Sequence, residues 1–263
     1  MPLTSAEEPP PSGGSDGDSG DGEVVARVGP HAFTADDAEA TLRNALLFVD
    51  QLTDGLPVDE GTVATIAEHR ARIAIAVDAT DTPLERRLTT VWDEWRAAAA
   101  AVRASGALGP AAVGTVVHLA TSDGGVPKVS TPRIEVGWGG VVGDRQASRD
   151  HHGRPWQALC LWSTQVIDAF VATGDTLAPG RAGENITVTA LPWERVRPGA
   201  LLQIGEVTCE VWAYALPCPK NARWFADGRF NRMHHRKGPV SRVYAAVVEP
   251  GPIELGDPVI LGT

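Results

Sequence analysis

The chain has 263 residues, a net charge of −10 and 43% hydrophobic residues, which is enough for one large domain or for a domain with a helical appendage. The acidic balance argues against non-specific nucleic-acid binding, and the sequence has no apolar run of about 18 residues that would predict a membrane span. Its three cysteines are an odd number, which argues against a disulfide framework and favours a reducing, cytoplasmic environment.

The first 27 residues are rich in proline, glycine, serine and aspartate. Such a segment has almost no apolar surface to bury. We therefore expect residues 1–27 to form a disordered acidic tail.

Residues 28–108 carry the pattern of a helical region. Thr34 is followed by two aspartates, which predicts an N-cap with acids in the first helical turn. Apolar residues at helical spacing predict three helices, at about 35–54, 60–77 and 83–106. With short connections they form a small bundle or a docked helical cap, in which Trp92 and Trp95 are expected to be packing residues.

The pattern changes beyond Gly109-Pro110 to short runs of β-branched and apolar residues separated by glycine and proline. These runs predict strands at 115–119, 133–136, 184–188, 201–204, 207–211, 243–248 and 258–261. One helix is expected at 163–172, with Ser163 as its N-cap. Many short strands with frequent turns favour a mainly β fold, a closed or half-closed barrel over residues 112–262.

Cys218 lies between two prolines, in the sequence Leu216-Pro217-Cys218-Pro219-Lys220. Each proline ring fixes its own φ and restricts the residue before it, which predicts a stiff turn rather than a helix or a mid-sheet strand. The charge of Lys220 would favour the thiolate. The segment that follows is strongly basic. Two interpretations remain open: a soft-metal or nucleophilic site facing an anion, or a buried structural cysteine beside a solvated basic loop.

Four short motifs follow one another beyond residue 112. In chain order they are Gly140-Val141-Val142-Gly143-Asp144-Arg145 followed by His151-His152-Gly153; Gly183-Glu184-Asn185; Pro217-Cys218-Pro219-Lys220; and Leu255-Gly256-Asp257-Pro258-Val259. Together they resemble the motifs of the MOSC family, named for the C-terminal part of molybdenum-cofactor sulfurases. The chain departs from the family pattern at Ala215, where members often carry an arginine.

The resemblance implies a β-barrel related to the small barrel of pyruvate kinase. It also implies a cysteine that carries sulfur or ligates molybdenum in the molybdenum cofactor (molybdopterin), and some members reduce N-hydroxylated compounds. Cys218 would then be the metal ligand and, with His152, a catalytic residue. The residues expected to hold the cofactor are Lys220, Arg223, Arg236, Arg242, Asn185 and Gly183, because guanidinium groups can grip phosphate and glycine allows close backbone approach.

The leading hypothesis is therefore a cytoplasmic molybdenum-cofactor oxidoreductase that acts on a small-molecule substrate. The sequence has no flavin, haem or iron–sulfur motif, so electrons would come from an external donor protein. Two alternatives remain: a sulfur carrier or transferase with a persulfide on Cys218, and a non-catalytic module that binds an anion or a partner.

Overall fold

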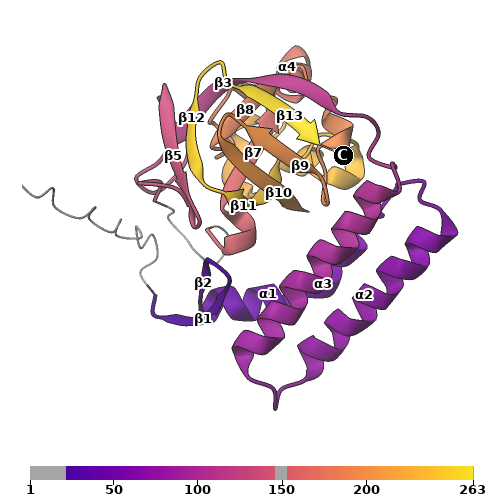
Figure 1. Cartoon of the computed structure of the whole chain (residues 1–263). Coiled ribbons are helices and arrows are strands. Elements are labelled where there is room, and N and C mark those ends of the chain that lie inside the picture. The colour runs from indigo at the N-terminus through magenta and orange to yellow at the C-terminus, as the bar shows by residue number, and fades with distance from the viewer. Residues whose placement is uncertain (1–21, 146–152, 263) are drawn as a thin grey trace, which may run out of the picture.

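The structure is a computed structural model and describes residues 22–145 and 153–262 (Figure 1). It opens with a hairpin that the sequence analysis did not predict, formed by β1 (Val24–Val28) and β2 (His31–Thr34). The last residues assigned to the tail, 24–27, are thus part of a strand. The hairpin was missed because each strand is short and Val24 and Val25 remain exposed, so the two-residue alternation of a half-buried strand is weak.

Three helices follow the hairpin, close to the predicted ranges: α1 (Ala35–Asp50), α2 (Glu60–Asp78) and α3 (Leu84–Ala104). Thr34 caps α1 as expected, because its hydroxyl accepts from the Asp37 backbone N–H at 3.3 Å while the Asp37 carboxylate accepts from the Thr34 N–H at 3.1 Å. Asp59 caps α2, because its carboxylate accepts from the Thr62 N–H at 2.9 Å. None of the helices in the described ranges is long and apolar enough to cross a membrane.

The rest of the chain is built on a closed barrel of seven strands, and the predicted mainly β fold with an N-terminal helical region is confirmed. The ring runs β13–β9–β10–β11–β7–β8–β3 and closes where β13 pairs with β3. Its strands are β3 (Ala112–Thr121), β7 (Leu159–Ser163), β8 (Ile186–Thr189), β9 (Leu201–Ile204), β10 (Val207–Tyr214), β11 (Val243–Glu249) and β13 (Pro258–Gly262).

Shorter elements decorate the ring. β7 and β8 are parallel, so the chain needs a crossover between them, and α4 (Thr164–Ala172) supplies it. Strand β4 (Val129–Thr131) adds to β3, and β12 (Gly251–Glu254), β5 (Arg133–Gly137) and β6 (Gly140–Val141) form a small separate sheet. The long connection between β10 and β11 contains three short 3-10 turns, Pro219–Trp224, Phe230–Met233 and His235–Lys237.

Helix α3 packs on strand β10 through aromatic rings, as expected for Trp92 and Trp95. The ring of Trp95 stacks on Trp212 at 3.9 Å between centroids, and Trp92 lies 4.2 Å from the same ring. Beside them the buried Glu210 carboxylate accepts from Arg103 at 2.6 Å and from Arg96 at 3.1 Å. The helical region and the barrel therefore share one hydrophobic core across the change of pattern near Gly109.

Candidate functional site

Three connections meet around the segment that contains Cys218. The Arg223 guanidinium donates to the Val126 carbonyl at 2.6 Å, which ties the β10–β11 connection to the β3–β4 turn. The Trp224 indole N–H donates to the Arg181 carbonyl at 3.0 Å, which ties the same connection to the segment before β8. The segment with the Cys218 motif and the segment with the Gly183-Glu184-Asn185 motif are thereby held close together.

Cys218 itself has the backbone that its two prolines predicted. It is extended, with φ −99° and ψ 135°, and it immediately precedes the 3-10 turn Pro219–Trp224. Its side chain is half-buried, whereas Cys160 and Cys209 are buried, and all three cysteines are free thiols. Cys218 is thus the accessible thiol of the three.

A buried arginine lies beside Cys218. Arg242, just before β11, is 3% exposed, and its Nη1 donates to the Ala182 carbonyl at 2.5 Å. Its guanidinium lies within electrostatic range of Cys218, Cys160, Tyr244 and Glu184. We call these five residues the Cys218 cluster. Within the described part of the chain the Nε of Arg242 has no hydrogen-bond partner, so the cluster holds a buried cation with one N–H group still to be satisfied.

The predicted cations differ sharply in environment. Lys220, Arg223 and Arg236 are exposed, whereas Arg242 is buried. The Arg223 guanidinium already bonds to the Val126 carbonyl and lies 4.7 Å from the centre of the Trp224 ring. Only Arg242 among these four is a member of the cluster, while the other three are exposed.

Asn185 joins two of the sequence motifs through hydrogen bonds inside the protein. Its Nδ2 donates to the Asp144 carboxylate at 2.9 Å and to the Ala120 carbonyl at 3.3 Å, and its Oδ1 accepts from the Cys160 N–H at 3.3 Å. Asp144 also pairs with Lys128, and both of these side chains are buried. These contacts make Asn185 a residue that positions strands β3 and β7; its assignment to cofactor binding stays a prediction.

The sequence reasoning did not single out Lys128. It stands in a turn after Pro127, where a solvated lysine is the ordinary expectation, but its side chain is buried and pairs with Asp144, 16 residues away. His152, the second predicted catalytic residue, lies outside the described residues.

Gly183 and Glu184 shape the loop before β8. Gly183 has φ +96°, and a Cβ there would approach the Val126 Cγ1 to 2.9 Å, so both the backbone angle and the space require glycine. The Glu184 carboxylate is fully buried and accepts from the Gly180 N–H at 2.7 Å. Its role in the described structure is to hold this loop closed.

Burial raises the pKa of the Glu184 carboxyl above its ordinary value of 4.5. The folded state therefore keeps the proton more readily than the unfolded chain, and the ionised carboxylate costs increasing stability as the pH rises above 4.5. We expect Glu184→Gln, which keeps the acceptor for Gly180 and cannot ionise, to be more stable than the wild type at neutral pH. Denaturant unfolding over a pH series should also show a flatter profile. A variant that is less stable at neutral pH would contradict this account.

The three cysteines are expected to differ in reactivity. Burial raises the pKa of Cys160 to about 11 and that of Cys209 to about 12, so both thiols stay protonated and enclosed at neutral pH. Limited alkylation with iodoacetamide followed by peptide mapping should therefore label Cys218 first. Equal or faster labelling of either buried cysteine would show that burial does not determine the order in which the three cysteines react.

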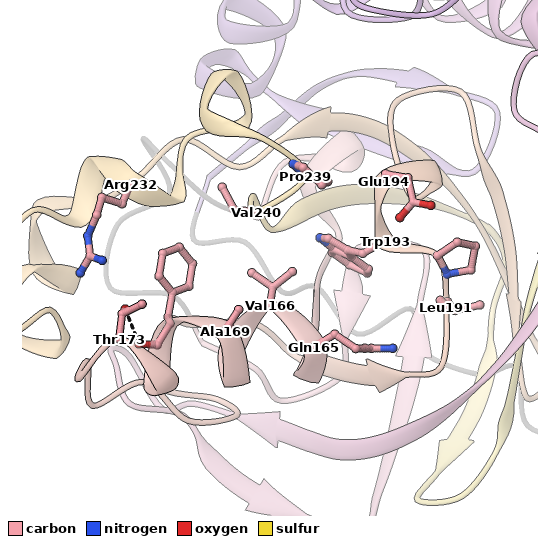
Figure 2. Close-up of a pocket in the computed structure, with 12 residues that line it drawn as sticks. Gln165, Val166, Ala169, Thr173, Leu191, Trp193, Glu194, Arg232, Pro239 and Val240 are labelled. Carbon is pink, nitrogen blue, oxygen red and sulfur yellow. Dashed lines mark hydrogen bonds between the residues drawn. The ribbon is translucent and has the colours of Figure 1, made fainter.

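A pocket lies away from Cys218, along one face of α4 (Figure 2). It has a volume of about 520 Å³, and its walls include Val166, Ala169, Trp193 and Val240. Arg232 stands at its edge and is already paired with the buried Asp175 at 2.6 Å. Cys218 does not line this pocket, so it is distinct from the Cys218 cluster.

Comparison with known proteins matches residues 148–260 to the model of the MOSC domain. Among solved structures the chain is similar to YiiM from Escherichia coli, at 19% identity over 57% of this chain and 70% of that one, with a TM-score of 0.44. For YiiM from Geobacillus stearothermophilus the identity is 21% over 59% and 76%, with a TM-score of 0.43. For YUAD protein from Bacillus subtilis it is 12% over 57% and 96%, with a TM-score of 0.45.

The comparison with curated proteins found no match. The family match spans the segment before β8 with Glu184 and Asn185, the Cys218 turn and the strand β11 that follows Arg242. The resemblance to the MOSC family predicted from the sequence is therefore confirmed over residues 148–260.

Proposed function

We propose that the Cys218 cluster binds a molybdenum cofactor of the pterin type and that the protein reduces N-hydroxylated small molecules. The observation that carries this proposal is the juxtaposition of an accessible thiol, Cys218, with the buried Arg242, whose Nε has no partner among the described residues. A thiolate is the soft ligand that molybdenum requires, and an unpaired buried guanidinium N–H is a site for an anionic oxygen.

The residues present fit this group. In the described ranges the structure has no set of three or more histidine, cysteine, aspartate or glutamate side chains that could hold a metal ion by themselves. A pterin cofactor brings its own sulfur ligands, so a single protein thiolate suffices. In this proposal its phosphate would meet Lys220, Arg223 and Arg236, which are all exposed.

The chain's own residues have separable tasks in this proposal. The cofactor, when bound, supplies the two-electron chemistry. Cys218 ligates it and Arg242 orients its anionic part. Burial raises the pKa of the Tyr244 phenol, so this hydroxyl keeps its proton at neutral pH. The Asp144–Lys128 pair and Asn185 fix the strands that present these groups.

The proposal includes an external electron-donor protein and a small-molecule substrate, with neither nucleic acid nor membrane as partner. It also places the protein in a reducing compartment such as the cytoplasm, because all three cysteines are free thiols.

The test is metal analysis of the full chain purified from a host with an intact cofactor pathway. Bound molybdenum with pterin, together with reduction of an N-hydroxylated probe by a chemical electron donor, would support the proposal. Cyanide-labile sulfur on Cys218 without bound metal would contradict the proposal and favour the alternative of a sulfur carrier or transferase. If neither is found, a non-catalytic binding module is the better description.

A further inference from the structure

The pocket along α4, which we call the α4 pocket, is large enough for a small molecule. Its volume of about 520 Å³ lies within the roughly 300–1,000 Å³ typical of ligand pockets. Its walls come from three parts of the chain: α4, residues 191–194 after β8, and the β10–β11 connection with Pro239 and Val240. No member of the Cys218 cluster lines it, so a ligand here would bind independently of the proposed cofactor.

The walls of the α4 pocket are mostly apolar and open to solvent. Val166 and Ala169 present one face of α4 to the pocket, Pro239 and Val240 lie across from it (Figure 2), and Pro192 also lines it. Ala169 and Pro239 are exposed, while Pro192 and Val240 are half-buried. A ligand can therefore cover these side chains without any change in the core, and an apolar ligand gains by removing this surface from water.

One carboxylate in the lining is uncompensated. Glu194 stands in the 3-10 turn Trp193–Arg195, and its exposed side chain makes no hydrogen bond or ion pair with any residue in the part of the chain that the structure describes. The guanidinium of the neighbouring Arg195 is directed elsewhere, because it donates to the carbonyls of Leu108 and Pro110. Glu194 thus leaves a free negative charge beside the apolar walls.

The cation in the lining is already compensated. Arg232 stands at the opposite end of the pocket from Glu194 (Figure 2). Its Nη2 donates to both oxygens of the buried Asp175 carboxylate at 2.6 Å, and it lies 3.5 Å from the Asp227 carboxylate. An anionic ligand would therefore compete with two acids for Arg232, whereas a cationic ligand would meet a free carboxylate at Glu194. The lining selects for positive charge.

We propose that the α4 pocket binds a small hydrophobic amine, that is, a protonated primary amine on a short apolar body. The body covers the apolar walls, and the ammonium group pairs with the Glu194 carboxylate. Because that carboxylate is exposed, the ion pair supplies only a small part of the affinity, and the contacts of the apolar body supply the rest.

The experiment titrates the isotope-labelled full chain with 2-phenylethylamine and follows the nuclear magnetic resonance signal of the Trp193 indole N–H, since Trp193 lines the pocket. We expect a saturable shift at millimolar concentration, with no shift of the Trp95 indole signal in the helical region. Two further probes each remove one part of the ligand. 2-Phenylethanol keeps the ring and the size but has no charge, and it should bind about two- to fivefold more weakly, the range for an exposed ion pair. Ethylamine keeps the charge but lacks the ring, and it should give no saturable shift at the same concentrations.

Two variants test the protein side. Glu194→Gln keeps the size of the side chain and removes its charge, so it should lower the affinity for 2-phenylethylamine by about two- to fivefold and leave that for 2-phenylethanol unchanged. Asp168→Asn is the matched control, because Asp168 is an exposed acid on α4 that does not line the pocket; its affinity for the amine should equal that of the wild type. Absence of a saturable Trp193 shift, equal affinity of the wild type for the amine and the alcohol, or an equal loss in both variants overturns the proposal. The probe comparison decides the matter on the wild type even if a variant fails to fold.

Discussion

Under the proposed function, replacing Cys218 with serine is expected to remove bound molybdenum and N-hydroxy reduction together, while the fold stays intact. Serine has nearly the same size but offers a hard, weakly acidic hydroxyl in place of a soft thiolate. Changes to residues that merely support a metal ligand cost about 10–100-fold in metal affinity, so loss of the ligand itself should cost more. Cys218 is half-buried in a connection rather than in a strand, which is why we expect little change in stability.

The measurement is molybdenum content and activity per bound molybdenum, with two comparison variants. Cys209→Ala removes a thiol that is 0% exposed in β10, and it should keep its molybdenum. Arg236→Ala removes an exposed charge, and it should lower cofactor retention by about threefold to tenfold, the effect of one charge-assisted contact at a solvated site, with unchanged activity per molybdenum. Full activity per molybdenum in Cys218→Ser would exclude this cysteine as the ligand.

Trp95→Ala is expected to lower the free energy of unfolding by about 3–5 kcal/mol, the usual cost of truncating a buried large aromatic residue. Trp95 is 0% exposed and stacks on Trp212 at 3.9 Å, so its loss opens a cavity between α3 and β10. Because the helices and the barrel share one core, helical and tryptophan signals should shift together in denaturant.

The matched control for this prediction is Ile75→Ala on α2, where the side chain is 69% exposed. Surface substitutions of this kind stay within about 0.5 kcal/mol. If Trp95→Ala also changed the stability by less than about 1 kcal/mol, or if only the helical signal shifted, the helical region would not rest on the barrel as the structure has it.

The helices and most strands could be predicted because their signals are local. Thr34 and Asp59 are caps followed by apolar periodicity, and the barrel strands are β-branched runs between glycines and prolines. The hairpin at 24–34 has no comparable signal, since three of the five residues of its first strand are exposed.

The candidate site was predictable only in part. Two prolines determine the conformation at Cys218 locally, and the structure agrees. By contrast, Arg236 and Arg242 look alike in the sequence, yet one is exposed and the other is buried beside Cys218. The difference arises from contacts with residues that are distant in the sequence, such as the Ala182 carbonyl 60 residues away. Local sequence patterns do not predict such contacts.

The contact between α3 and β10 predicts a sequence difference between related barrels that have the helical region and those that lack it. Glu210 and Trp212 are both 0% exposed, and both contact α3, the first through Arg96 and Arg103 and the second through Trp92 and Trp95. A barrel that lost this region would expose a large indole and a carboxylate stripped of its two arginines. Related chains without the helices should therefore carry smaller or polar residues at these two positions. The pair would then serve as a sequence marker that separates lineages with the helical region from lineages without it.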